Sequence, residues 1–183
     1  YRPDIRQQEA AAQSFGCGNP VAFADVQAEQ TVLDLGSGAG LDLMLAADRV
    51  GPGGRIIGVD MTEEMVEKAR SNIARAGYRN IEVRAGMIEE LPVETGSVDW
   101  VISNCVINLS PDKPQVFREI ARVLKTGGQF SISDIVVEEL PDILRENAAL
   151  YSACVAGAIA EQAYLSGLRT AGLDANEVTE RLV

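Results

Sequence analysis

The sequence predicts a doubly wound α/β fold, in which a mostly parallel sheet is the middle layer of a three-layer sandwich. From Thr31 onward, short β-rich runs alternate with helical runs. The β-rich runs are apolar and β-branched, as in parallel strands that helices cover on both faces. A length of 183 residues favours a single domain. We expect residues 31–183 to form this domain and residues 1–30 to form a lead-in that packs over the sheet.

Five strands are expected along the chain, followed by a short one near its end. The five are Thr31–Leu35, Arg55–Asp60, Ile81–Arg84, Val98–Asn104 and Gln129–Val136, and the short one lies near Val178–Leu182. Glycine and proline mark the boundaries between elements, as at the breaker of residues 51–54 and at Gly127-Gly128.

Helices are expected between these strands. The first spans Gly40–Val50, and the second follows Thr62, which can cap it, and ends at Gly77. The third opens at Ser110 with Pro111. The buried stripes of the second and third helices are Val66, Ala69, Ile73 and Ala76, and then Val116, Phe117, Ile120 and Leu124. Further helices are expected within Asp142–Gly172.

Composition narrows the classes of function. Sixteen basic and 27 acidic residues give a net charge of −11, which disfavours nucleic acid as a partner. We see no signal peptide and no apolar run long enough to cross a bilayer, so we expect a cytoplasmic protein without a membrane partner. The absence of histidine removes the usual general base and most catalytic zinc sites. The three cysteines cannot all pair within one chain, and in the cytoplasm we expect them to be reduced.

A glycine-rich turn indicates a nucleotide site. The run from Asp34 to Gly40, Asp-Leu-Gly-Ser-Gly-Ala-Gly, closes the first strand and opens the first helix. Its glycines permit a sharp turn and a close approach of the backbone to a ligand. Asp60 ends the second strand, at the position from which an acid can bind ribose hydroxyls. A purely structural turn is the alternative. A dinucleotide is a poor fit, because the third glycine of its fingerprint falls on Leu41.

The G-x-G-x-G spacing, with Asp34 two residues before the first glycine, resembles motif I of class I S-adenosylmethionine methyltransferases, which have a Rossmann-like fold. The resemblance continues through residues 59–61, 98–99 and 122–128. It implies that S-adenosylmethionine is converted to S-adenosylhomocysteine, that Asp34 faces the methionine end, and that Met61 and Ile88 sandwich the adenine. Many relatives carry an acid at Met87, and Glu89 is a possible substitute. The implied cofactor-binding residues are Asp34, Gly36, Ser37, Gly38, Gly40, Asp60, Met61, Gly86, Met87, Ile88 and Asn104.

Three cysteines suggest the methyl acceptor. Cys105 follows the fourth strand, Cys17 lies in a Gly/Pro turn of the lead-in, and Cys154 follows the fifth strand, so their thiols can converge at one edge of the sheet. Residues 16–20, residues 103–110, and Cys154 with Gly157-Ala158 resemble the three cysteine motifs of arsenite methyltransferases. The resemblance implies arsenic detoxification, in which As(III) bound by the three thiolates is methylated. It also implies an external thiol reductant, such as thioredoxin or glutathione, and a further carboxyl-terminal region that is truncated here.

Several alternatives stay open. Each cysteine, taken singly, could be a small buried hydrophobe. A zinc site fits poorly, because the cysteines are scattered and no histidine accompanies them. A small-molecule C- or O-methyltransferase of the quinone-ring type is one rival function, and a non-catalytic module that binds arsenic or the cofactor is another.

Overall fold

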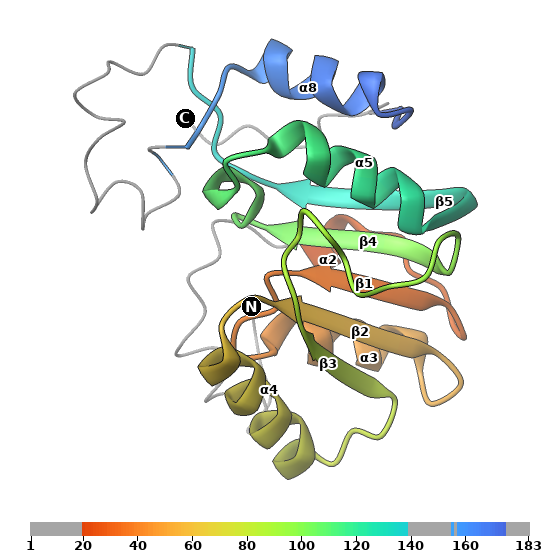
Figure 1. Cartoon of the computed structure of the whole chain (residues 1–183). Helices are drawn as coiled ribbons and strands as arrows, with labels where there is room; N and C mark the ends of the chain where they lie inside the picture. The colour runs from red at the N-terminus through yellow and green to blue at the C-terminus, as the bar shows by residue number, and fades with distance from the viewer. Residues whose placement is uncertain (1–19, 139–154, 156, 175–183) are drawn as a thin grey trace.

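The computed structural model describes residues 20–138, 155 and 157–174, which form a parallel sheet flanked by helices (Figure 1). Its strands are β1 (Thr31–Leu35), β2 (Arg55–Asp60), β3 (Ile81–Ala85), β4 (Val98–Asn104) and β5 (Leu124–Ser133). All four pairings are parallel, in the order β3-β2-β1-β4-β5. The order reverses at β1, where Leu35 pairs with Val59 on one side and with Ser103 on the other. Ligands of doubly wound sheets bind beyond the carboxyl ends of the strands at such a reversal.

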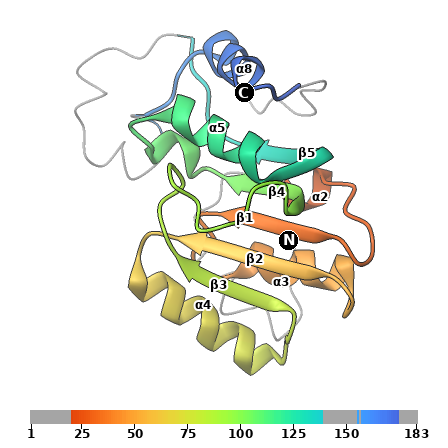
Figure 2. The same ribbon diagram turned by 45° about the vertical axis from the view of Figure 1, so that its right-hand side comes forward.

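Helices pack on both faces of this sheet, as the two views in Figures 1 and 2 show. They are α2 (Pro20–Phe23), α3 (Leu41–Val50), α4 (Glu63–Ala76), the 3-10 helix η1 (Ile107–Leu109), α5 (Lys113–Val123) and α8 (Glu161–Thr170). Val32 of β1 packs in a core cluster with residues of α2, α3 and α4. The next residue, Leu33, packs in a second cluster with residues of α5 and α8. The predicted three-layer, doubly wound fold is confirmed.

The predicted start of one helix and the predicted cap of another need correction. The helix after β4 begins at Lys113 and not at Ser110, because Asp112 caps it by accepting a hydrogen bond from the Gln115 amide at 3.0 Å. The preceding residues form η1 instead. Thr62 does occupy the N-cap position of α4, but its side chain makes no capping hydrogen bond.

The fifth strand is also placed differently. It covers Leu124–Ser133 and not Gln129–Val136, and its register with β4 shifts between the pairs Val98↔Leu124 and Trp100↔Gln129. Gly127 sits inside this irregular stretch with a left-handed φ of 80°. The glycine pair therefore deforms the start of the strand and does not separate it from α5.

Some predictions concern residues outside the described part. Cys17, Cys154, the short strand near Val178–Leu182 and most of the lead-in belong to this group. At the described end of the lead-in, the Pro20 carbonyl accepts a hydrogen bond from the Ser131 hydroxyl of β5 at 2.9 Å. The helix α8 confirms part of the helical content expected within Asp142–Gly172.

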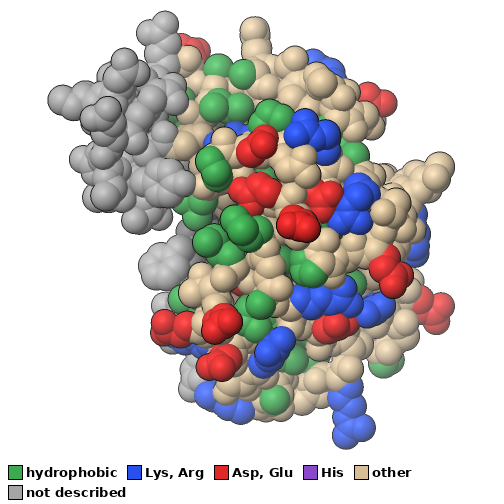
Figure 3. All heavy atoms as spheres, in the orientation of Figure 1, with side chains coloured by type: hydrophobic (Ala, Val, Ile, Leu, Met, Phe, Trp, Pro, Cys, Tyr) green, Lys and Arg blue, Asp and Glu red, His purple; other side chains and the backbone are tan. Residues whose placement is uncertain are grey.

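On the face seen in Figure 3, acidic, basic and apolar side chains are interspersed. Of the helices in the described ranges, none is long and apolar enough to serve as a bilayer-spanning segment.

Candidate functional site

The glycine turn lies at the carboxyl end of β1, at the reversal point of the sheet. Gly36, Gly38 and Gly40 have φ angles of 67°, 49° and 89°, a left-handed conformation that favours glycine. The amides of Gly36 and Ser37 both donate to the Val59 carbonyl, at 2.8 and 3.1 Å, which fixes the turn to β2. A Cβ on Gly38 would meet no atom within 4 Å. The turn therefore presents bare, ordered backbone to an open space.

Asp60 holds this turn from the end of β2. One of its carboxylate oxygens accepts from the Gly38 amide and the other from the Thr62 amide, each at 2.9 Å. The residue is 9% exposed. Because each carboxylate oxygen has a second lone pair, Asp60 can still accept hydrogen bonds from a ligand hydroxyl.

Two further carboxylates gather behind the turn. Asp34 is 2% exposed and Asp42 8%. Burial raises the pKa of Asp34 well above its ordinary value, and the nearby charges of Asp42 and Asp60 raise it further. The Asn104 side-chain amide donates to Asp42 at 3.2 Å, which links the end of β4 to the same cluster. Three acids so arranged favour a ligand that carries positive charge.

The Ser37 hydroxyl is buried in the same turn. Among the described residues it has no hydrogen-bond partner. Opposite it, a Cβ on Gly58 would lie only 2.8 Å from the Ser37 oxygen and 2.7 Å from Leu43, so β2 needs glycine there. The predicted residue Ser37 is thus part of the turn, with its hydroxyl facing β2 at Gly58.

The residues predicted to contact the adenine lie directly after β2 and in the loop after β3. Met61 is 73% exposed and Met87 53%, an unusual exposure for large apolar side chains, whereas Ile88 is buried in the core beneath α5. Gly86 donates its amide to the Asp60 carbonyl at 3.0 Å, which ties the loop to β2. The Glu89 carboxylate accepts a hydrogen bond from the Ser110 hydroxyl. Sequence reasoning missed this link between the loop and the turn after β4.

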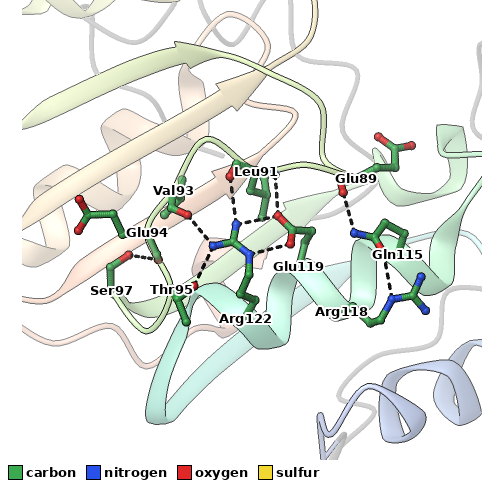
Figure 4. A network of polar contacts seen from close by, with 10 residues as sticks. All are labelled: Glu89, Leu91, Val93, Glu94, Thr95, Ser97, Gln115, Arg118, Glu119 and Arg122. Carbon is green, nitrogen blue, oxygen red and sulfur yellow. Dashed lines mark hydrogen bonds and ion pairs between the residues drawn. The ribbon is translucent and has the colours of Figure 1, made fainter.

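A partly buried ion pair connects this loop to α5 (Figure 4). Glu119 and Arg122 pair at 2.7 Å, and hydrogen bonding to Arg122 lowers the pKa of Glu119. Glu119 accepts from the Leu91 amide at 2.7 Å, while Arg122 donates to the carbonyls of Leu91 and Val93 at 3.0 and 2.8 Å. These contacts span about thirty residues of sequence, so no local pattern could reveal them.

Cys105 lies where β4 ends, directly after Asn104. It is 3% exposed and has a φ of 64°, a conformation that is rare for residues other than glycine. Its amide donates to the Ser133 carbonyl at 2.8 Å. The sulfur is disulfide-bonded, which differs from the expectation of reduced thiols, and its partner lies outside the described residues. The convergence of the three cysteines stays a prediction.

A polar cluster that sequence reasoning missed follows β5 beside this turn. The Tyr164 hydroxyl of α8 donates to Asp134 at 2.9 Å, and the Lys113 ammonium donates to the Ser110 carbonyl at 3.1 Å. Burial raises the pKa of Asp134 to about 6, against the lowering effects of Tyr164 and Lys113. Among the described residues, one side-chain oxygen of Asp134 and one of the buried Asn108 have no hydrogen-bond partner.

Comparison with known proteins places the chain. A family model described as a methyltransferase domain matches residues 27–172, which include every strand of the sheet and the turns described above. The chain belongs to the methyltransferase domain family. Within the described residues of this methyltransferase domain, no three Cys, Asp or Glu side chains form a group that could hold a metal ion.

Several relatives of this methyltransferase domain act on arsenic. An arsenite methyltransferase of Halobacterium salinarum is 48% identical over 174 residues, which cover 94% of this chain and 44% of that protein. The structure of CrArsM, an arsenic (III) S-adenosylmethionine methyltransferase from Chlamydomonas reinhardtii, matches with a TM-score of 0.82 at 38% identity, covering 93% of this chain and 62% of that one. A demethylmenaquinone methyltransferase of Listeria monocytogenes is 34% identical over 116 residues, covering 63% of this chain and 49% of that protein. The chain spans less than half the length of these curated relatives.

Proposed function

We propose that this methyltransferase domain transfers a methyl group from S-adenosylmethionine to trivalent arsenic held by the thiolates of Cys17, Cys105 and Cys154. One observation carries the proposal. Cys105 lies at the carboxyl end of β4, next to the reversal point where the glycine turn opens. The proposal is supported by the similarity to an arsenite methyltransferase, which is 48% identical in sequence over 94% of this chain.

The residues at the glycine turn fit the cofactor. Asp34 and Asp42 offer negative charge to its cationic methionine end, and Asp60 offers lone pairs to its ribose. The exposed side chains of Met61 and Met87 offer apolar surface to its adenine. When bound, S-adenosylmethionine supplies a methyl group on a sulfonium, which a nucleophile with a lone pair can accept without losing a proton.

The thiols would bind arsenic without help from a base. When arsenous acid meets three thiols, three As–S bonds form, three As–O bonds break, and each thiol proton leaves with a hydroxyl group as water. Soft As(III) favours such sulfur ligands. This chemistry suits a chain that contains no histidine. Because Cys105 is disulfide-bonded, two electrons and two protons from an external thiol reductant, such as thioredoxin or glutathione, must first open that bond.

The test is to incubate the reduced protein with sodium arsenite, a thiol and S-adenosylmethionine, and to separate the arsenic species by mass spectrometry. We expect methylated arsenic from the wild type and a near-complete loss with Cys105→Ser. Val136→Ala is the control, since its side chain is exposed and is not one of the proposed arsenic or cofactor ligands.

Two results would overturn the proposal. A triple Cys→Ser variant that still methylates a demethylmenaquinone analogue would favour the quinone-ring rival, which the similarity to the Listeria monocytogenes enzyme makes worth testing. Tight arsenite binding by the wild type with no methylated product would indicate a binding module.

A further inference from the structure

The glycine turn and the turn that carries Cys105 are in direct contact. They follow β1 and β4, which are neighbours in the sheet through the pair Leu35↔Ser103. Val106 fills the place that a side chain on Gly36 would occupy, because an ideal Cβ there would lie 2.5 Å from the Val106 Cγ2 and 2.7 Å from its Cβ. The missing side chain of Gly36 therefore lets the valine pack against the backbone of the turn.

Backbone hydrogen bonds hold both Gly36 and Val106 in place. The Gly36 amide is bound to the Val59 carbonyl at 2.8 Å, so the glycine turn cannot yield without disturbing β2. On the other side, the Val106 carbonyl accepts from the Leu109 amide at 3.0 Å within the tight turn of η1. A β-branched side chain such as valine is also stiff about χ1. A displacement of one turn must therefore be transmitted to the other.

Cys105 connects Val106 to the sheet, because it lies between Val106 and the last residue of β4. Its backbone has a φ of 64°, a left-handed conformation that is strained for a residue with a side chain. Its amide is anchored to the Ser133 carbonyl at 2.8 Å. The anchored amide and the packed Val106 together fix the backbone on both sides of Cys105. Once the disulfide is reduced, the position of the sulfur therefore depends on the packing of Val106 against Gly36.

We propose that Val106 is a positioning residue that couples the cofactor turn to the Cys105 sulfur, so that binding of the methyl donor and binding of arsenite strengthen each other. This inference rests on the proposed function. A ligand that orders the glycine turn orders Val106 and hence Cys105, and thermodynamic linkage requires arsenite to have the same effect on the cofactor. Couplings of this kind amount to roughly 5- to 150-fold in affinity.

The experiment measures this coupling directly by isothermal titration calorimetry. S-adenosylhomocysteine is titrated into the full chain, reduced with a phosphine, in the absence and in the presence of saturating sodium arsenite. For the wild type we expect affinity to rise by at least about fivefold with arsenite. For Val106→Ala we expect that ratio to fall close to one, while the affinity for each ligand alone changes by less than about threefold.

Matched variants separate positioning from general damage. Val106→Thr keeps the branched shape and should keep the coupling, and Val136→Ala, at an exposed position, should leave it unchanged. If Val106→Ala does not melt cooperatively, Val106→Leu, which moves the branch point away from Gly36, replaces it and should also lose the coupling.

The outcomes are distinct. A wild type that binds both ligands and methylates arsenic but shows no coupling overturns this inference and leaves the proposed function standing. Coupling that survives in both Val106→Ala and Val106→Leu overturns it as well. A wild type that does not bind arsenite at all overturns the proposed function, and this inference with it.

Discussion

Replacing Asp134 by Asn should change how the stability of the protein depends on pH. The carboxyl group accepts a hydrogen bond from Tyr164 of α8, and burial raises its pKa from 3.8 to about 6 in the folded chain. A group whose pKa is raised by folding stabilises the fold in its protonated form. Its contribution is complete below the unfolded-state pKa near 4 and is lost as the pH rises through about 6. The asparagine side chain keeps an acceptor for Tyr164 but has no charge to bury.

The size of the effect follows from the two pKa values. Each pKa unit corresponds to about 1.4 kcal/mol, so the rise from 3.8 to about 6 corresponds to about 3 kcal/mol. Roughly 1.4 kcal/mol of this falls between about pH 5 and pH 8, by integrating the proton-binding difference over that window. The wild type should therefore lose about 1.4 kcal/mol of stability relative to Asp134→Asn as the pH rises from about 5 to 8.

The assay is urea unfolding followed by the fluorescence of Trp100, the only tryptophan, which is 6% exposed in the sheet. Glu82→Gln is the control, because Arg84 and Arg55 lower the pKa of Glu82 to about 2. The contribution of Glu82 is present above its unfolded-state pKa and is lost only as the pH falls, so this variant should show little change over the window. A difference between Asp134→Asn and wild type that stays constant with pH, or decreases as the pH rises, would refute the reasoning.

Three further outcomes are expected. Asp34→Asn should weaken the binding of S-adenosylmethionine by roughly tenfold or more, which corresponds to the loss of one charged contact. It should weaken the binding of S-adenosylhomocysteine less. Equal losses of affinity for the two ligands in calorimetry would contradict a role of Asp34 toward the sulfonium. Gly36→Ala should lower the free energy of unfolding by about 2–5 kcal/mol, because the alanine is strained at a left-handed φ and its Cβ overlaps with Val106. Adding Val106→Ala to this variant should restore part of the lost stability. Denaturant titrations in which the double variant is no more stable than Gly36→Ala would contradict the contact. Glu119→Ala should lower the free energy of unfolding by about 2 kcal/mol, since it removes the charge partner of Arg122 and leaves the Leu91 amide without its acceptor. Glu119→Gln should lower it less, and equal unfolding midpoints for the variants and the wild type would argue against the network.

The fold could be predicted because its signals are local. Apolar, β-branched runs marked β1 and β2 to the residue, and the same pattern located β4 from Val98 to Asn104. The errors occurred where a distant or competing group decides the structure. For example, α5 is capped by Asp112 and not by Ser110, because the Asp112 carboxylate accepts a hydrogen bond from the Gln115 amide.

The glycine turn was predictable from the sequence, but the contacts that hold it in place were not. The spacing of Gly36, Gly38 and Gly40 follows from the backbone that such a turn requires, and their left-handed φ angles confirm it. The packing of Val106 on Gly36 depends on which strands are neighbours, because the two residues are 70 positions apart. The pair Asp134–Tyr164 likewise joins the end of β5 to α8. Neither belongs to a periodic pattern that a sequence displays.

The acids at the glycine turn connect the stability of the fold to its chemistry. Asp34 is fully buried near two other carboxylates, and both burial and repulsion favour its protonated form when no cation is present. Folding alone gains nothing from such a group, because an apolar residue of similar size would avoid the desolvation of a carboxyl at this position. A cationic ligand reverses the balance, since it stabilises the ionised form and so binds with release of a proton. After methyl transfer the remaining thioether is uncharged, so the attraction that the sulfonium supplied is lost. Under the proposed function, we therefore expect these acids to bind the methyl donor more tightly than its product.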